Sequence, residues 1–236
     1  MTQTDLPAAN RLISGLPDAE REGLLALCER VQVPLGKTIV EAGQRLSHAW
    51  FPVDSFFSLV TQVDEEADLE VGLSGPEGMI GAGLVLGIME CPQRALVQGA
   101  GDALVIEAAQ LHNEMERSLA LRRRLAAYVY VLMVQFSQAA VCIHGHLLEK
   151  RLARWLLMSS DRAGLDDFQV THDFLAYMLG VRRSGVTEAA RILQSLGLIK
   201  YRYGKVHILD RAGLEAMSCP CYGIDKTTYR RVLGTS

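Results

Sequence analysis

Several side chains that can hydrogen-bond to nucleobases fall on one side of a short segment near residue 187. Arg183, Thr187 and Arg191 are spaced four residues apart, and Ser184 and Glu188 lie beside them. In a helix this spacing places all five on a common face. Arginine binds O6 and N7 of guanine, glutamate accepts from N4 of cytosine, and a hydroxyl bonds to base edges or phosphate. The pattern therefore indicates a surface that reads the major groove of DNA.

The segments around this face carry the signals of two short helices. Thr171 is a capping residue in front of an apolar-periodic segment, and Gly180 supplies the left-handed conformation that ends a helix. The next segment begins at Arg182 and keeps an apolar stripe as far as Leu193. Two short helices joined by a glycine turn favour a helix-turn-helix.

The residues that follow predict a wing. Residues 198–203 and 205–209 have the composition of two strands around Gly204. Basic side chains on such strands can lie along a phosphate backbone. The complete set of candidate DNA-binding residues is Thr171, Arg182, Arg183, Ser184, Thr187, Glu188, Arg191, Lys200, Arg202 and Lys205.

The charge of the chain divides into two parts. The net charge is −3, but residues 1–146 hold ten Lys and Arg against eighteen Asp and Glu, whereas residues 147–236 hold fourteen against nine. A single exposed Lys or Arg is most simply a solvated surface charge. The turn, the spacing, the wing and the charge asymmetry together favour DNA binding by the basic part.

The acidic part has a different pattern. Residues 16–20 start a short amphipathic helix, and residues 31–106 contain short Val-, Phe- and Leu-rich runs broken by glycines, which predicts an antiparallel barrel or roll. Beyond Ala108 the periodicity predicts one long helix. Its middle, residues 126–134, is apolar nearly all round, so we expect a second copy of the chain to cover it. A fully buried core helix in a monomer is the alternative.

Composition limits the class of protein. The chain has 236 residues, of which 49% are hydrophobic and 22% charged, which suits two small globular domains. The longest apolar run is half of the roughly 18 residues that a membrane span needs. The start of the chain lacks a basic segment followed by an apolar one. Five scattered cysteines favour reduced thiols. We therefore expect a cytoplasmic protein with no membrane partner.

Residues 171–199 and the wing resemble the DNA-binding domain of the cyclic-AMP receptor protein and FNR superfamily of transcriptional regulators. The resemblance extends over nearly the whole chain. It implies an α+β fold with an N-terminal antiparallel β-roll over residues 1–110, a long dimerisation helix over 111–145 and a winged helix-turn-helix over 146–236. By this resemblance the β-roll would be a double-stranded β-helix like that of cyclic-nucleotide-binding domains.

The resemblance also implies a function. The chain would be a homodimeric, sequence-specific regulator that reads a palindromic operator, with double-stranded DNA, a second copy and RNA polymerase as partners. Thr171 would contact phosphate, and the start of the second helix would meet bases. The family pattern Ser-Arg-Glu-Thr-Val is not kept here, so the operator sequence cannot be carried over. The alternative is a ligand-binding regulatory protein whose winged domain contacts another protein. The chain has no Gly-x-Ser-x-Gly motif and no complete phosphate-binding loop, because the Gly36-Lys37-Thr38 triplet lacks the glycine that should stand five residues before it, so we expect no enzyme.

The resemblance further points to an effector pocket, at Gly81, Ala82, Arg94 and Ala95. Nucleotide-binding members carry a Glu directly after the glycine that matches Gly81, where it holds the ribose, and an Arg on the phosphate. Here Ala82 replaces that Glu, and Arg94 either takes the phosphate role or pairs with a carboxylate. We therefore expect an effector that is unknown and is not cyclic AMP, and we assign no cofactor.

Two cysteine-containing segments are candidates for metal or redox sites. Residues 142–146 hold Cys142, His144 and His146, and residues 219–221 hold Cys219 and Cys221 around a proline that is typical of a helix stop. Neither segment alone offers enough ligands. The sequence therefore assigns no metal ligands, and the cysteine cluster of the family's iron-sulfur sensors is missing from the N-terminal region.

Overall fold

The computed structural model describes residues 10–62 and 68–234. It starts with two short helices, α1 (Arg11–Ser14) and α2 (Asp18–Ala26). The predicted amphipathic helix is α2, which begins directly after Pro17 and buries Leu24. Proline suits this place because it has no N–H to leave without a partner in the first turn.

The predicted antiparallel roll is present. Its strands are β1 (Glu29–Val33), β2 (Thr38–Val40), β3 (His48–Pro52), β4 (Phe56–Gln62), β5 (Asp68–Ser74), β6 (Arg94–Gly99) and β7 (Gly101–Glu107), with the short helix η1 (Ala82–Leu86) between β5 and β6. They form two antiparallel sheets in the orders β1-β7-β3 and β2-β6-β4-β5. Phe51 and Phe57, one from each sheet, are fully buried in a shared core.

The predicted long helix is confirmed over residues 119–145, but the predicted residues before it belong to a separate helix. The structure has α3 (Ala108–Arg117) and then α4 (Leu119–Gly145), separated at Ser118. Ser118 leaves the helical conformation at φ −115° and ψ 107°, and its hydroxyl accepts a hydrogen bond from the backbone N–H of Leu121. A serine side chain that bonds to the backbone in this way starts a new helix instead of continuing the old one.

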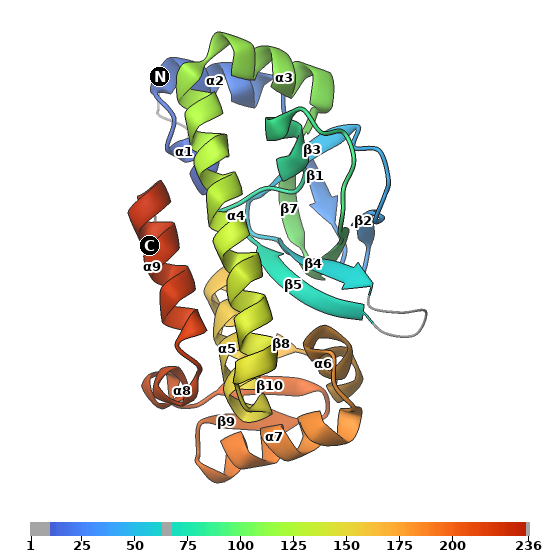
Figure 1. Cartoon of the computed structure of the whole chain (residues 1–236), viewed down its shortest axis with the longest axis vertical. Coiled ribbons are helices and arrows are strands. Elements are labelled where there is room, and N and C mark those ends of the chain that lie inside the picture. The colour runs from blue at the N-terminus through green and yellow to red at the C-terminus, as the bar shows by residue number, and fades with distance from the viewer. Residues whose placement is uncertain (1–9, 63–67, 235–236) are drawn as a thin grey trace, which may run out of the picture.

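Helix α4 runs from the N-terminal helices to the winged domain (Figure 1). One side, with Leu125 and Tyr128, is buried against the roll, and another side packs on the last helix of the chain. Five large apolar residues of α4 are exposed, namely Leu119, Tyr130, Met133, Val141 and Ile143, and by helix geometry the first four lie on one further side. By length and composition alone α4 could cross a membrane, a property that core helices of soluble proteins share.

The C-terminal part contains α5 (Leu148–Ala163), β8 (Asp167–Gln169), α6 (His172–Leu179), α7 (Arg183–Ser195), β9 (Ile199–Arg202), β10 (Lys205–Ile208), α8 (Arg211–Met217) and α9 (Cys221–Leu233). The helix-turn-helix and both wing strands are where the sequence predicts them. Strand β8, which pairs with β10, and helix α9 were not predicted. Pro220 was expected to follow the end of a helix, and it does follow α8, but it also stands at the N-cap of α9.

The two halves of the chain share buried surface. Phe56, Val60 and Leu73 of the roll belong to the core of the winged domain, and Tyr229 and Leu233 of α9 belong to the core of the roll. Figure 1 shows α9 alongside α4 after the chain has completed the winged domain. The winged domain is therefore attached to the roll through α5 and α6 and to α4 through α9.

Candidate nucleic-acid interface

Local signals position the second helix of the helix-turn-helix. The hydroxyl of Thr171 accepts from the backbone N–H of Phe174 at 3.1 Å and starts α6. Gly180 ends α6 at φ 62°, a conformation that costs a glycine little. Helix α7 then buries a stripe at Val186, Ala189, Ala190 and Leu193. The burial of this stripe directs the opposite face of α7 outward.

The outward face of α7 carries the residues that the sequence selected. Arg182, Arg183, Ser184, Thr187, Glu188 and Arg191 are all exposed. Figure 1 shows α7 at the end of the molecule farthest from α2 and α3. The outward face of α7 is therefore accessible in this structure.

The charges on this face form loose ion pairs. Arg183 Nε lies 3.3 Å from Asp173 Oδ1, and both side chains are about 70% exposed. Arg191 donates two hydrogen bonds to Glu188, at 3.0 and 2.6 Å. The bond from Arg191 lowers the pKa of Glu188 below its usual value. Exposed ion pairs contribute little to stability, so these side chains can exchange partners at small cost.

The wing presents a second set of basic residues. Tyr203 and Gly204 connect β9 to β10 at φ 52° and 72°, as the two-residue turns of tight hairpins require. Lys200, Arg202 and Lys205 are exposed on these strands. Tyr203 is 88% exposed, and the Arg202 guanidinium lies 4.9 Å from its ring centre. Sequence analysis overlooked Tyr203, although its place before a turn glycine marks it as the tip.

A histidine links the two helices. His172 Nδ1 lies 3.0 Å from Thr187 Oγ1, and its ring stacks on Tyr201 with centres 4.4 Å apart. Burial is the main cause that lowers the pKa of His172, followed by the charge of Arg183. The hydroxyl of Thr187 is thus partly engaged within the domain. Sequence analysis missed His172, because its contact with α7 crosses the turn.

The residues predicted to line an effector pocket do not all meet. Gly81 and Ala82 line a pocket of about 220 Å³ between η1 and α4, together with apolar side chains such as Leu132 and Phe136. In the part of the chain that the structure describes, Glu90 is the one charged side chain of this lining. Ala95 is fully buried in the core of the roll.

Arg94 lies outside that lining. It forms an ion pair with Asp68, and its guanidinium lies 5.8 Å from the ring centre of Tyr177. Tyr177 belongs to α6, and its hydroxyl also donates to Asp68. The sequence left two roles open for Arg94, binding an effector phosphate or pairing with a carboxylate. In the structure Arg94 pairs with a carboxylate, at the contact between the roll and the winged domain.

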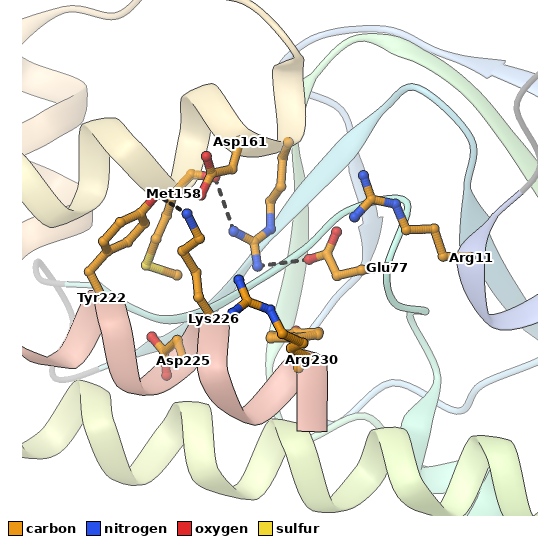
Figure 2. A pocket seen from close by; sticks show the side chains of 10 residues that line it. Arg11, Glu77, Met158, Asp161, Tyr222, Asp225, Lys226 and Arg230 are labelled. Carbon is orange, nitrogen blue, oxygen red and sulfur yellow. Dashed lines mark hydrogen bonds and ion pairs between the residues drawn. The ribbon is translucent and has the colours of Figure 1, made fainter. Parts of the chain in front are cut away.

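A second pocket, of about 200 Å³, lies between α5, α9 and the segment after β5 (Figure 2). Arg162 Nη2 lies 2.7 Å from Glu77 Oε1, and both side chains are about 10% exposed. Arg154 bonds to Asp225 at 2.6 Å in similar burial. Burial raises the pKa of Asp225 even though Arg154 opposes the effect. These pairs join α5 to the roll and to α9.

A polar network continues this interface across β4, β5 and β6. Ser58 Oγ donates to Glu70 at 2.6 Å, and Gln98 Nε2 donates to Ser159 of α5 at 3.1 Å. Burial raises the pKa of Glu70 from 4.5 to about 7, against the opposing effects of the Ser58 bond and the charges of Arg154 and Arg162. Glu70 is therefore largely protonated in the folded protein at slightly acidic pH.

Comparison with known proteins adds two findings. Residues 150–217 match the model of the Crp-like helix-turn-helix domain. No protein of curated function matches the sequence.

Solved structures with a similar fold cover most of the chain. FixK2 from Bradyrhizobium japonicum is 12% identical, with a TM-score of 0.69 over 81% of this chain and 98% of that one. The c-di-GMP responsive global regulator CLP of Xanthomonas campestris is 17% identical, with a TM-score of 0.67 over 81% and 99%. A CRP-family transcriptional regulator from Thermus thermophilus is 18% identical, with a TM-score of 0.65 over 80% and 96%. At these identities the likeness establishes the fold.

Proposed function

We propose that this chain is a DNA-binding transcriptional regulator of the Crp/Fnr family and not an enzyme, and that it acts as a homodimer that reads a palindromic operator through the major groove. The observation that carries the proposal is the outward face of α7, where Arg183, Thr187 and Glu188 are exposed above a buried apolar stripe. Their hydrogen-bonding groups suit guanine and cytosine edges.

The exposed side of α4 supports the dimer. Tyr130, Met133 and Val141 expose between 48% and 62% of their surface on a helix whose other sides are packed. Exposed apolar stripes of this kind mark contacts with another molecule. A second copy of α4 on this stripe would pair two winged domains. Paired domains would contact half-sites about one helical turn apart.

The wing would hold the backbone on either side of the groove. Lys200, Arg202 and Lys205 are exposed, and a phosphate contact from such residues is independent of sequence. Thr171 would add a phosphate contact from the start of α6. We further infer that the protein acts in the cytoplasm without a membrane partner, and that RNA polymerase is the partner through which a bound dimer acts.

The pocket between η1 and α4 does not favour cyclic AMP as the effector. Ala82 offers no hydrogen bond to a ribose, and Arg94 is engaged with Asp68. The apolar lining suits a small apolar molecule better than a phosphate. We propose that any effector bound there is not a cyclic nucleotide.

Salt titration of DNA binding tests this function against the alternative, a winged domain that contacts another protein. Duplexes would first be selected from a random pool with the purified full-length protein. Affinity for the selected duplex should fall steeply with salt, because Lys and Arg release counterions from phosphates. The selected sites should be twofold symmetric. Failure to select any sequence, or affinity indifferent to salt, would favour the protein-binding alternative.

The dimer has its own test. Met133→Glu places a charge in the centre of the exposed stripe and should convert the dimer into a monomer in sedimentation experiments at micromolar concentration. Glu22→Gln, an exposed change on α2, is the control. A wild-type monomer under these conditions would contradict the α4 interface.

A further inference from the structure

Two ligand-bearing segments that are distant in the sequence meet where α4 ends. Cys142 lies in the last turns of α4 and His146 is its C-cap residue, whereas Cys219 and Cys221 flank the proline between α8 and α9. Three sulfur atoms and one imidazole nitrogen lie within 4.8 Å of one another. The sequence showed each pair as an incomplete site, and the fold brings the two pairs together. His144, the other histidine of this segment, is exposed and lies outside the group.

The distances approach those of a tetrahedral metal site. Cys142 Sγ lies 3.4 Å from Cys219 Sγ, and Cys221 Sγ lies 3.7 Å from His146 Nδ1. Zn²⁺ binds sulfur at about 2.3 Å and imidazole at about 2.0 Å, so its ligands are separated by about 3.5 to 3.8 Å. Small side-chain rotations would complete this geometry. A space in which all four atoms lie so close admits one ion rather than a cluster of several irons.

The burial and surroundings of the group also suit a metal ion. Cys142, Cys219 and Cys221 are 3% exposed or less, and they form a buried cluster separate from the two hydrophobic cores. Arg151 and Arg154 interact electrostatically with Cys142 and Cys219. Arg154 is already paired with Asp225, so Arg151 would balance the single net negative charge of three thiolates around Zn²⁺. His146 is only half-buried, which leaves a side from which an ion can enter.

A disulfide accounts for fewer of these observations. A bond between Cys142 and Cys219 would require an S–S distance of about 2.05 Å. It would use two of the four side chains and leave Cys221 and His146 without a part in it. We propose that Cys142, His146, Cys219 and Cys221 bind one Zn²⁺ ion per chain.

The position of the site gives the ion a structural task. His146 ends α4, and Leu147 begins the turn into α5 and the winged domain. Cys221 is the first residue of α9, which packs along α4. The ion would therefore fasten α9 to the end of α4 and fix the direction in which the winged domain leaves that helix. Any effect on operator affinity rests on the proposed function, but binding of the ion does not.

Metal content and cobalt substitution test the proposal on untagged full-length protein purified under reducing conditions. Elemental analysis should find one zinc per chain. After removal by a chelator, Co²⁺ alone should rebind at one equivalent and give thiolate-to-cobalt charge-transfer bands with the intense visible bands of a tetrahedral site. Absence of stoichiometric binding by the wild-type protein would overturn the proposal. An absorbance band near 400 nm in anaerobically purified protein, with iron in place of zinc, would also overturn it.

Two pairs of variants locate the site. His146→Ala and Cys221→Ser should each weaken Co²⁺ binding at least about tenfold, because each removes a ligand. His144→Ala, two residues away, and Cys91→Ser, a buried thiol of the roll, should bind Co²⁺ like the wild type. Equal affinity in His146→Ala and His144→Ala would place the ion elsewhere. Since no DNA is present, this result is independent of whether the protein binds an operator.

Discussion

The winged domain uses charged side chains in opposite ways on its two faces. On the outer face, Arg183 and Arg191 are about 70% exposed and their ion pairs stand in solvent. On the face toward the roll, Arg154 and Arg162 are about 10% exposed, and each lies within 2.7 Å of a carboxylate. An arginine kept in solvent is available for a phosphate or a base. An arginine that is buried together with its carboxylate partner joins two elements of the same molecule. Removal of that partner lowers the free energy of unfolding strongly, because the remaining charge is buried without compensation.

This contrast separates effects on stability from effects on DNA binding. Substitutions on the inner face should lower the free energy of unfolding, and those on the outer face should leave it unchanged. Four predictions test the contrast, beginning with the largest expected effect.

Arg162→Met should lower the free energy of unfolding by about 3 to 5 kcal/mol, because it leaves the carboxylate of Glu77 buried without its partner. Urea unfolding followed by circular dichroism measures the change. Arg183→Ala is the matched control on the outer face and should stay within about 0.5 kcal/mol of the wild type. Similar losses in both variants would remove the distinction between the two faces.

Glu70→Gln should remove a pH dependence of stability. Burial raises the pKa of Glu70 from 4.5 to about 7, so between these values the folded protein holds a proton that the unfolded chain has lost. The wild type should therefore lose stability, on the order of 2 kcal/mol, as pH rises from about 4.5 to about 7. Thermal unfolding between pH 5 and 8 measures this slope. Glu22→Gln, at an exposed position of α2, should keep it; a slope unchanged in Glu70→Gln would show that another group causes it.

Arg183→Ala should weaken binding to the selected operator by about 1 to 3 kcal/mol and relax the preference at one base pair, as expected when a contact to guanine is lost. Fluorescence anisotropy with operator and random duplexes measures both affinities. The loss should be confined to the operator. An equal loss on the random duplex would assign Arg183 to phosphate instead.

Lys205→Ala should have the smallest effect and the least selective one. It should weaken operator and random duplex alike, and reduce the slope of log affinity against log salt by about 1. Lys37→Ala removes the same charge from the roll and serves as the control. If the slope falls equally in the control, the salt dependence comes from overall charge and not from the wing.

Sequence analysis succeeded where the determinants are local. Thr171 caps α6, Gly180 ends it and Gly204 lies in the wing turn, and each acts on residues next to it in the chain. The spacing of residues within α7 likewise follows from helix geometry alone. The helix-turn-helix and the two wing strands were therefore predicted, and the candidate DNA-binding residues were all found exposed.

The failures concern contacts between distant residues. Nothing near Arg94 in the sequence indicates that Asp68 and a tyrosine of α6 would engage it. Cys142 and Cys219 likewise come together only through the packing of α9 on α4. Helix α9 itself was missed because a proline was interpreted as a stop signal, although proline is equally suited to a helix start. Hydrophobic periodicity and helix-capping signals depend on neighbouring residues, so they do not predict contacts between residues that are distant in the sequence.

The unbroken length of α4 has a mechanical consequence. With 27 residues it is a rigid rod roughly 40 Å long. A tilt of about 10° at the end beside the roll would displace the other end by about 7 Å, which is larger than one turn of a helix. Such a displacement carries a side chain out of reach of its base. Small rearrangements in the roll would then be amplified into complete engagement or complete release at the duplex.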